Sequence, residues 1–298
     1  MDALALSRVD DLATHLFVDI LAFKCHKMNL NFHPCCWKTK RRCRAILKSF
    51  VEDSDEARAT EQLMGLAFVK QYAEKHHLDS AQIAQHLRMY LRQYHPNSGI
   101  KIAVDRRYGN SFWQGGRIVA TRSWRVGEVI GALSGKMAPL TPKQEAELIV
   151  EGQNDFSVVV ATRGNSASLL LGPVAFVNHD CRPTCRLDWT NSSVRVRTIR
   201  PMEVGTEITF FYGKSYFGSK NGECKCATCE ENGNGAYKIL RVLHGKEVPL
   251  HRRFSRPNPV SRPVYGLRSN TLSSSLTAEG DDPRPWRCRL RSCRNLTN

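Results

Sequence analysis

Three cysteines close together in the chain have the spacing of metal ligands. Cys224, Cys226 and Cys229 place three thiols in one short segment, and a tetrahedral structural zinc site needs four ligands at about 2.3 Å. The fourth ligand must therefore come from elsewhere. Cys181 and Cys185 are both candidates, and spacing does not choose between them. We predict a zinc site that ties the two segments together, in preference to unrelated free thiols.

The segment before Cys181 carries further polar groups at the end of an apolar run. Asn178 and His179 follow the predicted strand Leu169–Val177, and Pro183 ends the strand pattern. A buried amide or imidazole must be satisfied or used. Taken alone, His179 indicates an interior histidine with its hydrogen bonds made. Tyr212 alone likewise indicates a core tyrosine with a bonded hydroxyl.

Paired glycines stand before another apolar segment. Gly115 and Gly116 precede Arg117 and Ile118. Glycines let a backbone turn tightly or come close to a ligand. Taken alone, the pattern favours a hairpin turn.

The remaining cysteines do not form a second convincing site. The spacing of those near the amino terminus fits no simple ligand pair, so buried or free thiols are preferred. A pair near the carboxy terminus is likewise interpreted as free thiols. The amino-terminal group is Cys25, Cys35, Cys36 and Cys43 with His26 and His33, and the carboxy-terminal pair is Cys288 and Cys293.

Composition places the chain among globular proteins that meet polyanions. Its 298 residues are 41% hydrophobic, and 44 Lys and Arg against 28 Asp and Glu give a net charge of +16. Acidic residues interrupt the amino-terminal segment, and no run of 18 apolar residues occurs, so neither a signal peptide nor a membrane span is expected. The odd count of 11 cysteines suits metal ligands and free thiols in a reducing, intracellular compartment.

The first third of the chain is predicted to be helical. Apolar residues recur at helical spacing in three segments, Leu12–Phe23, Asp55–His77 and a helix capped at Asp79. The basic run Lys38–Arg44 favours a solvated helix face, with nucleic-acid contact as the sharper alternative.

After residue 99 the pattern changes to short strands with one helix around Pro142–Val150, which indicates a compact α+β fold. Beyond residue 238, prolines, serines and arginines replace large apolar residues, so we predict a basic, mostly disordered tail. The predicted strands are Ile100–Val104, Arg117–Trp124, Glu128–Leu133, Phe156–Ala161, Leu169–Val177, Val194–Ile199 and Glu207–Tyr212.

Four motifs in order resemble one family. Gly115–Ile118, Asn178–Pro183, Gly205–Gly213 and Cys224–Cys229 together resemble the SET-domain protein lysine methyltransferases with a post-SET zinc site. Further segments resemble the suppressor-of-variegation 4-20 type, which methylates lysine 20 of histone H4. These segments are Asp10–Thr14, His26–Asn29, Glu151–Ser157, Leu171–Asn178 and Tyr216–Asn221.

The resemblance implies a domain organisation. A small helical domain at 1–99 would precede a β-rich SET fold of short sheets with a pseudoknot at 100–216. A zinc-binding post-SET segment at 217–237 and the basic tail at 238–298 would follow.

The resemblance also assigns roles to residues. Tyr212 would orient the substrate amine, with Phe156 and Phe211 around the lysine. Ser157 would limit the number of methyl groups, although a strand serine facing a neighbouring backbone fits it equally well. The zinc ligands would be Cys181, Cys224, Cys226 and Cys229, which leaves Cys185 free. S-adenosylmethionine would lie against Met28, Gly115, Gly116, Arg117, Ile118, Asn178, His179 and Lys225.

Three positions depart from the family pattern. Thr184 stands where asparagine is usual, Phe211 where an acidic residue is common, and Leu170 where close relatives carry tryptophan, which removes an aromatic wall from the expected lysine channel. The expected partners are histone H4 in nucleosomes and, nonspecifically, DNA through the basic surface and tail, with a location in the nucleus on chromosomes and no membrane contact. The alternatives are another protein lysine as substrate, or a catalytically silent chromatin-binding module. Final methylation state and oligomeric state are left open.

Overall fold

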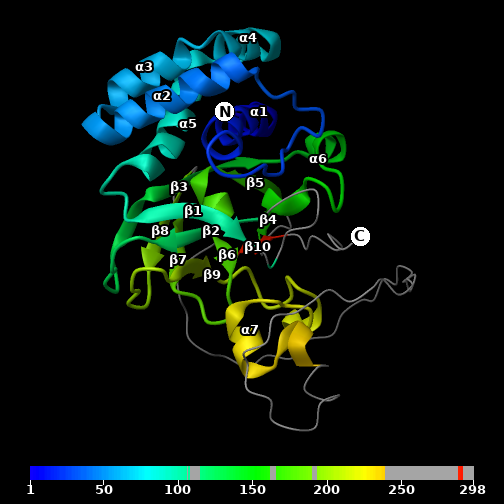
Figure 1. The fold of residues 1–298 in the computed structure, drawn as a ribbon. Coiled ribbons are helices and arrows are strands. Elements are labelled where there is room, and N and C mark those ends of the chain that lie inside the picture. The colour runs from blue at the N-terminus through cyan, green and yellow to red at the C-terminus, as the bar shows by residue number, and fades with distance from the viewer. Residues whose placement is uncertain (106, 108–114, 162–165, 190–192, 239–287, 291–298) are drawn as a thin grey trace.

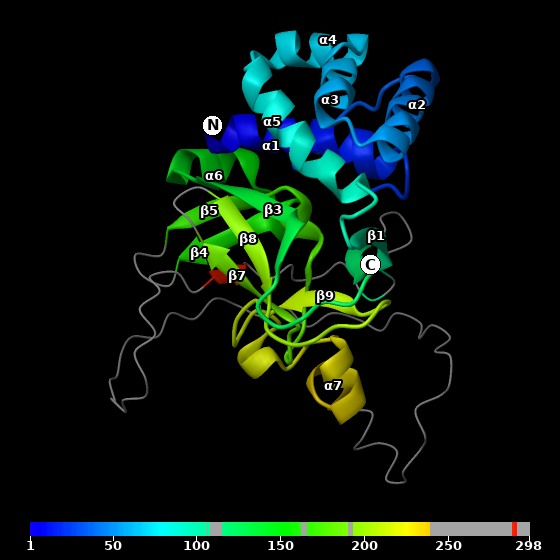
Figure 2. The ribbon, with the colours of Figure 1, turned by 90° about the vertical axis from the view of Figure 1, so that its left-hand side faces the viewer.

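The computed structural model describes residues 1–105, 107, 115–161, 166–189 and 193–238, together with the backbone of 288–290. Helices α1 to α5 form a layer at one end, two sheets lie in the middle, and the short helix α7, Ala227–Asn232, lies at the opposite end (Figures 1 and 2). Most of the predicted disordered tail lies outside the described residues. Within them, no helix is both long and apolar enough to cross a membrane.

Capping aspartates begin three of the five helices in the first layer. Asp2, Asp55 and Asp79 each accept a hydrogen bond from a backbone N–H in the first turn, which satisfies an otherwise unpaired donor. The helix predicted to start at Leu12 in fact starts at Ala3 and continues through a π-helical turn to Asp19. The bounds are α1 Ala3–Thr14, α2 Trp37–Asp53, α3 Glu56–Met64, α4 Ala67–His76 and α5 Ser80–Leu91.

The smaller sheet has four strands in the order β1-β2-β9-β6. Strands β6 and β9 pair in parallel, whereas the other pairs are antiparallel. This pairing places the segment after residue 177 beside the segment after residue 206. The bounds are β1 Ile100–Asp105, β2 Gly115–Ala120, β6 Asn178–His179 and β9 Glu207–Phe210.

The larger sheet has six strands in the order β10-β4-β5-β3-β8-β7, all antiparallel. Helix α6, Pro142–Leu148, follows β3 and starts with a capping box between Thr141 and Gln144. The last strand shows that three residues near the carboxy terminus return to this sheet beside β4. The bounds are β3 Val129–Pro139, β4 Val158–Ala161, β5 Ala167–Leu171, β7 Cys185–Trp189, β8 Ser193–Thr198 and β10 Cys288–Leu290.

The predicted strand Leu169–Val177 is not continuous. Strand β5 ends at Leu171, Gly172 adopts φ of 108°, and Pro173–Phe176 forms a 3-10 turn before β6 begins. A positive φ is open to glycine at little cost, and proline suits the start of the turn that follows. The bend lets β5 remain in the larger sheet while Asn178 and His179 join the smaller one.

Buried residues form four clusters in the described part of the chain, and one of them is shared between the helices and the larger sheet. Ala3 and Leu6 of α1 and the buried Met28 pack with residues of β4 and β5, including Leu169 and Leu171. The helical part and the sheets therefore share apolar surface that neither could leave in water without cost. The predicted α+β class, with helices before a β-rich part, is confirmed.

Candidate functional site

The candidate site lies where β6 meets β9. Asn178 is opposite Thr209, and His179 is opposite Phe210. Two segments that are separated by about thirty residues in the sequence thus present their polar side chains together. This is the juxtaposition expected for Asn178, His179 and Tyr212.

The Asn178 amide lies among oxygen acceptors. Its Nδ2 is 3.0 Å from Asp105 Oδ2, 3.2 Å from the Gly116 carbonyl and 3.2 Å from Glu207 Oε1. An amide group has two hydrogens, so it satisfies two of these acceptors at a time. Burial raises the pKa of the Glu207 carboxyl, although the Asn178 hydrogen bond acts in the opposite direction.

Gly116 is packed too closely to accept a side chain. A Cβ atom there would lie 2.5 Å from a ring carbon of Phe176 and 2.9 Å from a ring carbon of Phe23. Gly115 and Gly116 belong to β2, and Gly115 pairs with Asp105, so they begin a strand. The hairpin turn that the pattern favours when taken alone is therefore wrong for Gly115 and Gly116. Phe23 also shows that the amino-terminal segment reaches this region.

Tyr212 is fixed by its hydroxyl and by neighbouring rings. The hydroxyl donates to the Val177 carbonyl at 2.8 Å. The rings of Phe210 and Tyr216 have centroids 4.7 and 4.9 Å from that of Tyr212, and the Phe217 ring also packs nearby. Such aromatic contacts, one tilted, one edge-on and one stacked, stabilise a single ring position.

His179 joins Tyr212 to the thiols. Its Nδ1 accepts the Tyr212 backbone N–H at 3.1 Å, and its Nε2 lies 3.4 Å from Cys181 Sγ. Burial lowers the pKa of His179 to about 4, so the imidazole is neutral near pH 7. Because Nδ1 must be the acceptor, the single ring hydrogen is on Nε2, which donates toward the sulfur.

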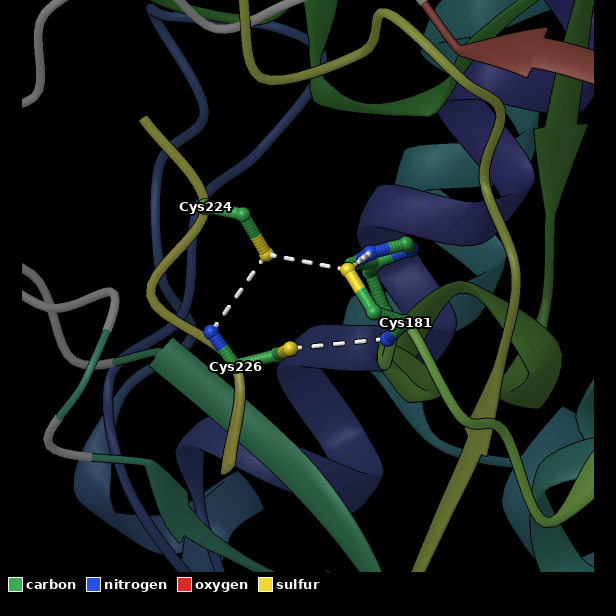
Figure 3. A group of neighbouring side chains, drawn as sticks. Cys181, Cys224 and Cys226 are labelled. Carbon is green, nitrogen blue, oxygen red and sulfur yellow. Dashed lines mark hydrogen bonds between the residues drawn. The ribbon is translucent and has the colours of Figure 1, made fainter. Parts of the chain in front are cut away.

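Four cysteine sulfurs converge below this strand. Cys181 Sγ lies 3.9 Å from Cys224 Sγ and 3.5 Å from Cys229 Sγ, and the Cys181 backbone N–H donates to Cys226 Sγ at 3.4 Å. Figure 3 shows Cys181 facing Cys224 and Cys226, which come from a separate segment. Four ligands placed tetrahedrally at about 2.3 Å would be about 3.8 Å from one another, close to the two sulfur distances observed.

A histidine is also close enough to be considered. The ligand atoms of His179, Cys181, Cys224 and Cys226 all lie within 4.8 Å of one another. A hydrogen bond from the Cys224 thiol lowers the pKa of Cys226 to about 6, against the effect of burial. A readily formed thiolate suits a metal ligand.

The other cysteines are placed apart from this cluster. Cys185 packs in the main core with 1% of its surface exposed. Cys25, Cys35 and Cys43 are buried in the helical part and Cys36 is exposed. Cys288 and Cys293 have no described side chains.

Phe211 and Lys225 are the exposed members of the expected site. The Phe211 side chain is 41% exposed, and its ring centroid lies 5.3 Å from that of His179. Lys225 is exposed, and its carbonyl accepts a hydrogen bond from Arg107 at 3.1 Å. Arg107 also pairs with Glu230 of α7, Ala227–Asn232.

The other expected residues lie in or near the packed core. Ile118 and Met28 are buried. Arg117 pairs with Glu207 at 3.7 Å. Phe156 is half-buried and faces His26, with ring centroids 5.7 Å apart.

Ser157 is buried without a hydrogen-bond partner for its hydroxyl among the described residues. It lies in the 3-10 turn Asp155–Ser157, directly before β4, and not within a strand. A buried hydroxyl without a partner is uncommon and calls for an explanation.

Two departures from the family pattern are accommodated. The Thr184 hydroxyl accepts the Thr209 backbone N–H at 2.9 Å, and the Thr184 N–H lies 3.2 Å from Thr209 Oγ1, so Thr184 still ties its loop to β9. Leu170 is 3% exposed and packs in the main core cluster. A change at position 170 therefore acts here through packing.

Two acidic residues beside Asn178 were not predicted from the sequence. Asp105 ends β1 and Glu207 begins β9, and both reach Asn178 only because β1, β2, β9 and β6 lie in that order. Glu207 could have been suspected from the sequence, because it stands in the same predicted strand as Tyr212. Asp105 had none that could be recognised without the strand register.

The chain is similar to known proteins over nearly its whole length. Residues 115–213 match the SET domain. The histone-lysine N-methyltransferases Suv4-20 of Caenorhabditis elegans and Caenorhabditis briggsae are 36% and 35% identical, covering 88% and 91% of this chain and 89% and 82% of theirs. The histone-lysine N-methyltransferase SET9 of Phaeosphaeria nodorum is 32% identical over 77% of this chain and 34% of its own. This chain belongs to the Suv4-20 family of SET-domain histone-lysine N-methyltransferases.

Proposed function

We propose that this chain transfers methyl groups from S-adenosylmethionine to lysine 20 of histone H4. SET methyltransferases use this methyl donor, the Suv4-20 relatives are named histone-lysine N-methyltransferases, and the resemblance to the suppressor-of-variegation 4-20 type implies lysine 20 of histone H4 as the target. The observation that carries the proposal is the fixed position of Tyr212, whose hydroxyl is bonded to the Val177 carbonyl next to Asn178 and His179. A methyl transfer needs such a preset geometry because its rate depends on alignment of donor and acceptor.

The donor would lie against β2 and β6. When bound, S-adenosylmethionine supplies an electrophilic methyl group on a positively charged sulfur. Asp105 and Glu207 beside Asn178 give this region acidic groups that suit a cationic cofactor. The residues proposed to hold it are Gly115, Gly116, Arg117, Ile118, Asn178, His179 and Lys225, with Met28 supporting the pocket from the buried side.

The chain's aromatic residues would receive the substrate lysine. The exposed ring of Phe211 and the half-buried ring of Phe156 are proposed to flank its alkyl stem. An apolar channel lowers the pKa of a lysine by desolvation, which favours the neutral amine that can accept a methyl group. The Tyr212 hydroxyl would orient this amine and does not act as a nucleophile.

Ser157 is proposed to set how many methyl groups can be added. Its hydroxyl is buried and has no partner among the described residues, and it directly follows Phe156. A small side chain beside the amine leaves room for methyl groups, whereas its oxygen limits that room. We propose that this residue determines whether the product is mono-, di- or trimethyllysine.

The thiol cluster is proposed to hold a structural zinc ion. The sulfur separations of 3.5 and 3.9 Å fit a tetrahedral site. The fourth ligand would be Cys229 and not His179, because the hydrogen on His179 Nε2 occupies the position that a metal would need. His179 would instead donate to the sulfur of Cys181, as groups around a metal site often do. The proposed ligands are Cys181, Cys224, Cys226 and Cys229.

Contact with nucleosomal DNA is proposed for helix α2. Cys43, Leu47 and Phe50 are buried on one face, so the opposite face is directed to solvent. Trp37 at the start of the helix is 65% exposed. Cations near a helix amino terminus are unfavourable for the helix dipole, so their concentration here suits a partner with phosphates. The exposed cations of α2 are Lys38, Arg41, Arg42, Arg44 and Lys48.

The test is radiolabelled methyl transfer to nucleosomes containing either wild-type histone H4 or histone H4 with lysine 20 replaced by arginine. We expect label on wild-type histone H4 and none on the arginine version. The same activity is proposed for the protein on chromatin in the nucleus. Label that persists on the arginine version would overturn the substrate and keep the enzyme class. An absence of label from a folded protein that still binds nucleosomes would favour a catalytically silent chromatin-binding module.

A further inference from the structure

The segment Cys25–Asn29 is held from two opposite sides by buried polar side chains. It has no regular secondary structure of its own around Met28, so its backbone groups need partners elsewhere. One partner comes from helix α1, and the other comes from the turn after α6. These two contacts define the position of the segment.

Asp11 of α1 provides the first contact. Its Oδ1 accepts the Met28 N–H at 2.7 Å, and its Oδ2 accepts the Asn29 N–H at 2.8 Å. The residue is 1% exposed. Both carboxyl oxygens are therefore used by backbone donors that lie 17 and 18 residues further along the chain.

Asn154 provides the second contact. Its Nδ2 donates to the Met28 carbonyl at 2.6 Å and to the Leu148 carbonyl at 2.8 Å, and its Oδ1 accepts the Val150 N–H at 2.7 Å. It is also 1% exposed. Met28 thus has its N–H tied to the helical part and its C=O tied to the segment that carries Phe156 and Ser157.

The same segment lies against the proposed site. The His26 ring faces Phe156, with centroids 5.7 Å apart. Phe23, which precedes the segment, packs so close to Gly116 that a Cβ atom there would lie only 2.9 Å from its ring. A shift of the Met28 backbone would therefore move surfaces beside both the proposed lysine channel and the proposed donor pocket.

Asp10 is a neighbouring carboxylate with different partners. Its Oδ1 accepts hydrogen bonds from His86 Nε2 at 2.9 Å and from the Tyr90 hydroxyl at 2.8 Å. Both partners belong to α5 and are 0% exposed. Asp10 therefore secures α1 to α5 inside the helical layer, whereas Asp11 secures the Cys25–Asn29 segment.

We propose that Asp11 is a positioning residue for the S-adenosylmethionine pocket, acting through the backbone of Met28 and Asn29. This inference rests on the proposed function, which places the methyl donor beside this segment. Asp11 touches neither the methyl donor nor the lysine in this role. Its effect is to fix the wall against which the donor binds.

The replacement Asp11→Asn tests this directly. A carboxyl group offers two oxygens as acceptors in either protonation state, whereas an amide offers one oxygen and an NH₂ group that cannot accept. One of the two backbone N–H groups is then left without its partner, and the segment must move to satisfy it. We expect the Kd for S-adenosylmethionine, measured by calorimetry on the full chain, to rise about tenfold, which corresponds to about 1.4 kcal/mol.

Asp10→Asn is the matched control, because it changes the adjacent buried carboxylate on the same helix. We expect it to lower the melting temperature while leaving the Kd for S-adenosylmethionine within about twofold, a difference smaller than about 0.5 kcal/mol. Equal effects of the two replacements on that Kd would reduce Asp11 to a general structural role and overturn the inference. An unchanged Kd in Asp11→Asn would overturn it as well.

Asn154→Asp changes the second contact of the Met28 backbone, and it is the alternative test if Asp11→Asn does not fold. It keeps the acceptor for the Val150 N–H and removes the donor to the Met28 carbonyl. We expect a similar rise in the Kd, and an unchanged value would contradict the inference. If the unaltered chain itself binds no S-adenosylmethionine, the proposed function fails first, and that result is distinct from a failure of Asp11 alone.

Discussion

The Nδ1 atom of His179 accepts the backbone N–H of Tyr212 at 3.1 Å while its Nε2 lies 3.4 Å from Cys181 Sγ. One imidazole therefore connects the proposed catalytic tyrosine with the proposed metal site. The ring is buried and has a contact at each nitrogen, and burial lowers its pKa to about 4, so it is neutral near pH 7. Disruption of the thiol cluster should consequently be felt at Tyr212, although most of its cysteines come from a separate segment of the chain.

Tyr212→Phe should lower kcat by at least about tenfold while leaving the binding of S-adenosylmethionine unchanged. The change removes the hydroxyl that is bonded to the Val177 carbonyl and is proposed to orient the lysine amine, and the rate of methyl transfer depends on that alignment. Tyr72→Phe is the control, because the Tyr72 hydroxyl donates to the Arg8 carbonyl in the helical layer. Steady-state methyl transfer should separate the two variants, and equal rates would remove Tyr212 from the mechanism.

Cys229→Ser should lose bound zinc, whereas Cys185→Ser should retain it. Cys229 is one of four converging sulfurs, but Cys185 lies in the main core. Metal content of purified protein, measured by mass spectrometry, checks this difference. Retention of zinc in Cys229→Ser together with its loss in His179→Gln would identify the imidazole as the fourth ligand instead.

Ser157→Ala should stabilise the protein and shift the product toward higher methylation. The Ser157 hydroxyl is buried and lacks a partner among the described residues, and an unsatisfied buried group costs about 1–3 kcal/mol. Removing its oxygen also enlarges the space beside the proposed lysine amine. Denaturant unfolding and mass spectrometry of the histone product measure the two effects. Ser168→Ala on β5 should leave the product distribution unchanged.

Asp11 should make stability fall as pH rises. Burial raises the pKa of its carboxyl to about 8, although the Asn29 and Met28 N–H groups and the nearby Lys27 oppose this shift and Asp10 adds to it. The folded protein therefore keeps a proton that the unfolded chain releases near pH 3.8. Between these values the folded state binds more protons, so the free energy of unfolding decreases by at most about 1.4 kcal/mol per pH unit. Denaturant unfolding of the unaltered chain should show this slope, and Asp11→Asn should lack it.

Replacing Arg41, Arg42 and Lys48 with glutamine should raise the KM for nucleosomes without changing the KM for a histone H4 peptide. These cations are exposed on α2. For each DNA phosphate that the variant no longer neutralises, the slope of the logarithm of the binding constant against the logarithm of salt concentration should become shallower by about 0.9. The triple replacement of Lys70, Lys75 and Lys143 makes the same change in charge at other exposed positions. Equal effects of both triple variants would indicate net charge and not a surface on α2.

Local sequence signals predicted much of the secondary structure. Asp79 caps α5 and Pro142 opens α6 as expected, because these residues act on their own first turn. Strand β7 was missed, although Cys185 and Leu187 are buried on alternate positions. The run Leu169–Val177 was misjudged because the positive φ of Gly172 is a property of the folded chain, and a glycine within an apolar run does not show it in advance.

The site was predictable where motifs are local and not where it depends on strand order. The count of zinc ligands left Cys181 and Cys185 as candidates, the resemblance selected Cys181, and the structure places its sulfur 3.9 Å from that of Cys224. The acidic partners of Asn178 come from β1 and β9, and the anchors of Met28 come from α1 and from Asn154. Contacts between residues so distant in the chain are set by packing, which composition and periodicity do not encode.

The core cluster shared by α1 and β5 means that the residues matching the SET domain depend on packing contacts outside that match. Residues 115–213 carry the SET match, yet β5 buries Leu169 and Leu171 against Ala3, Leu6 and Met28. A fragment confined to the matched residues would expose that apolar face and lose the Met28 anchor. The residues that match the SET domain therefore share part of their core with the first helix of the chain, and we expect a fragment without that helix to be less stable.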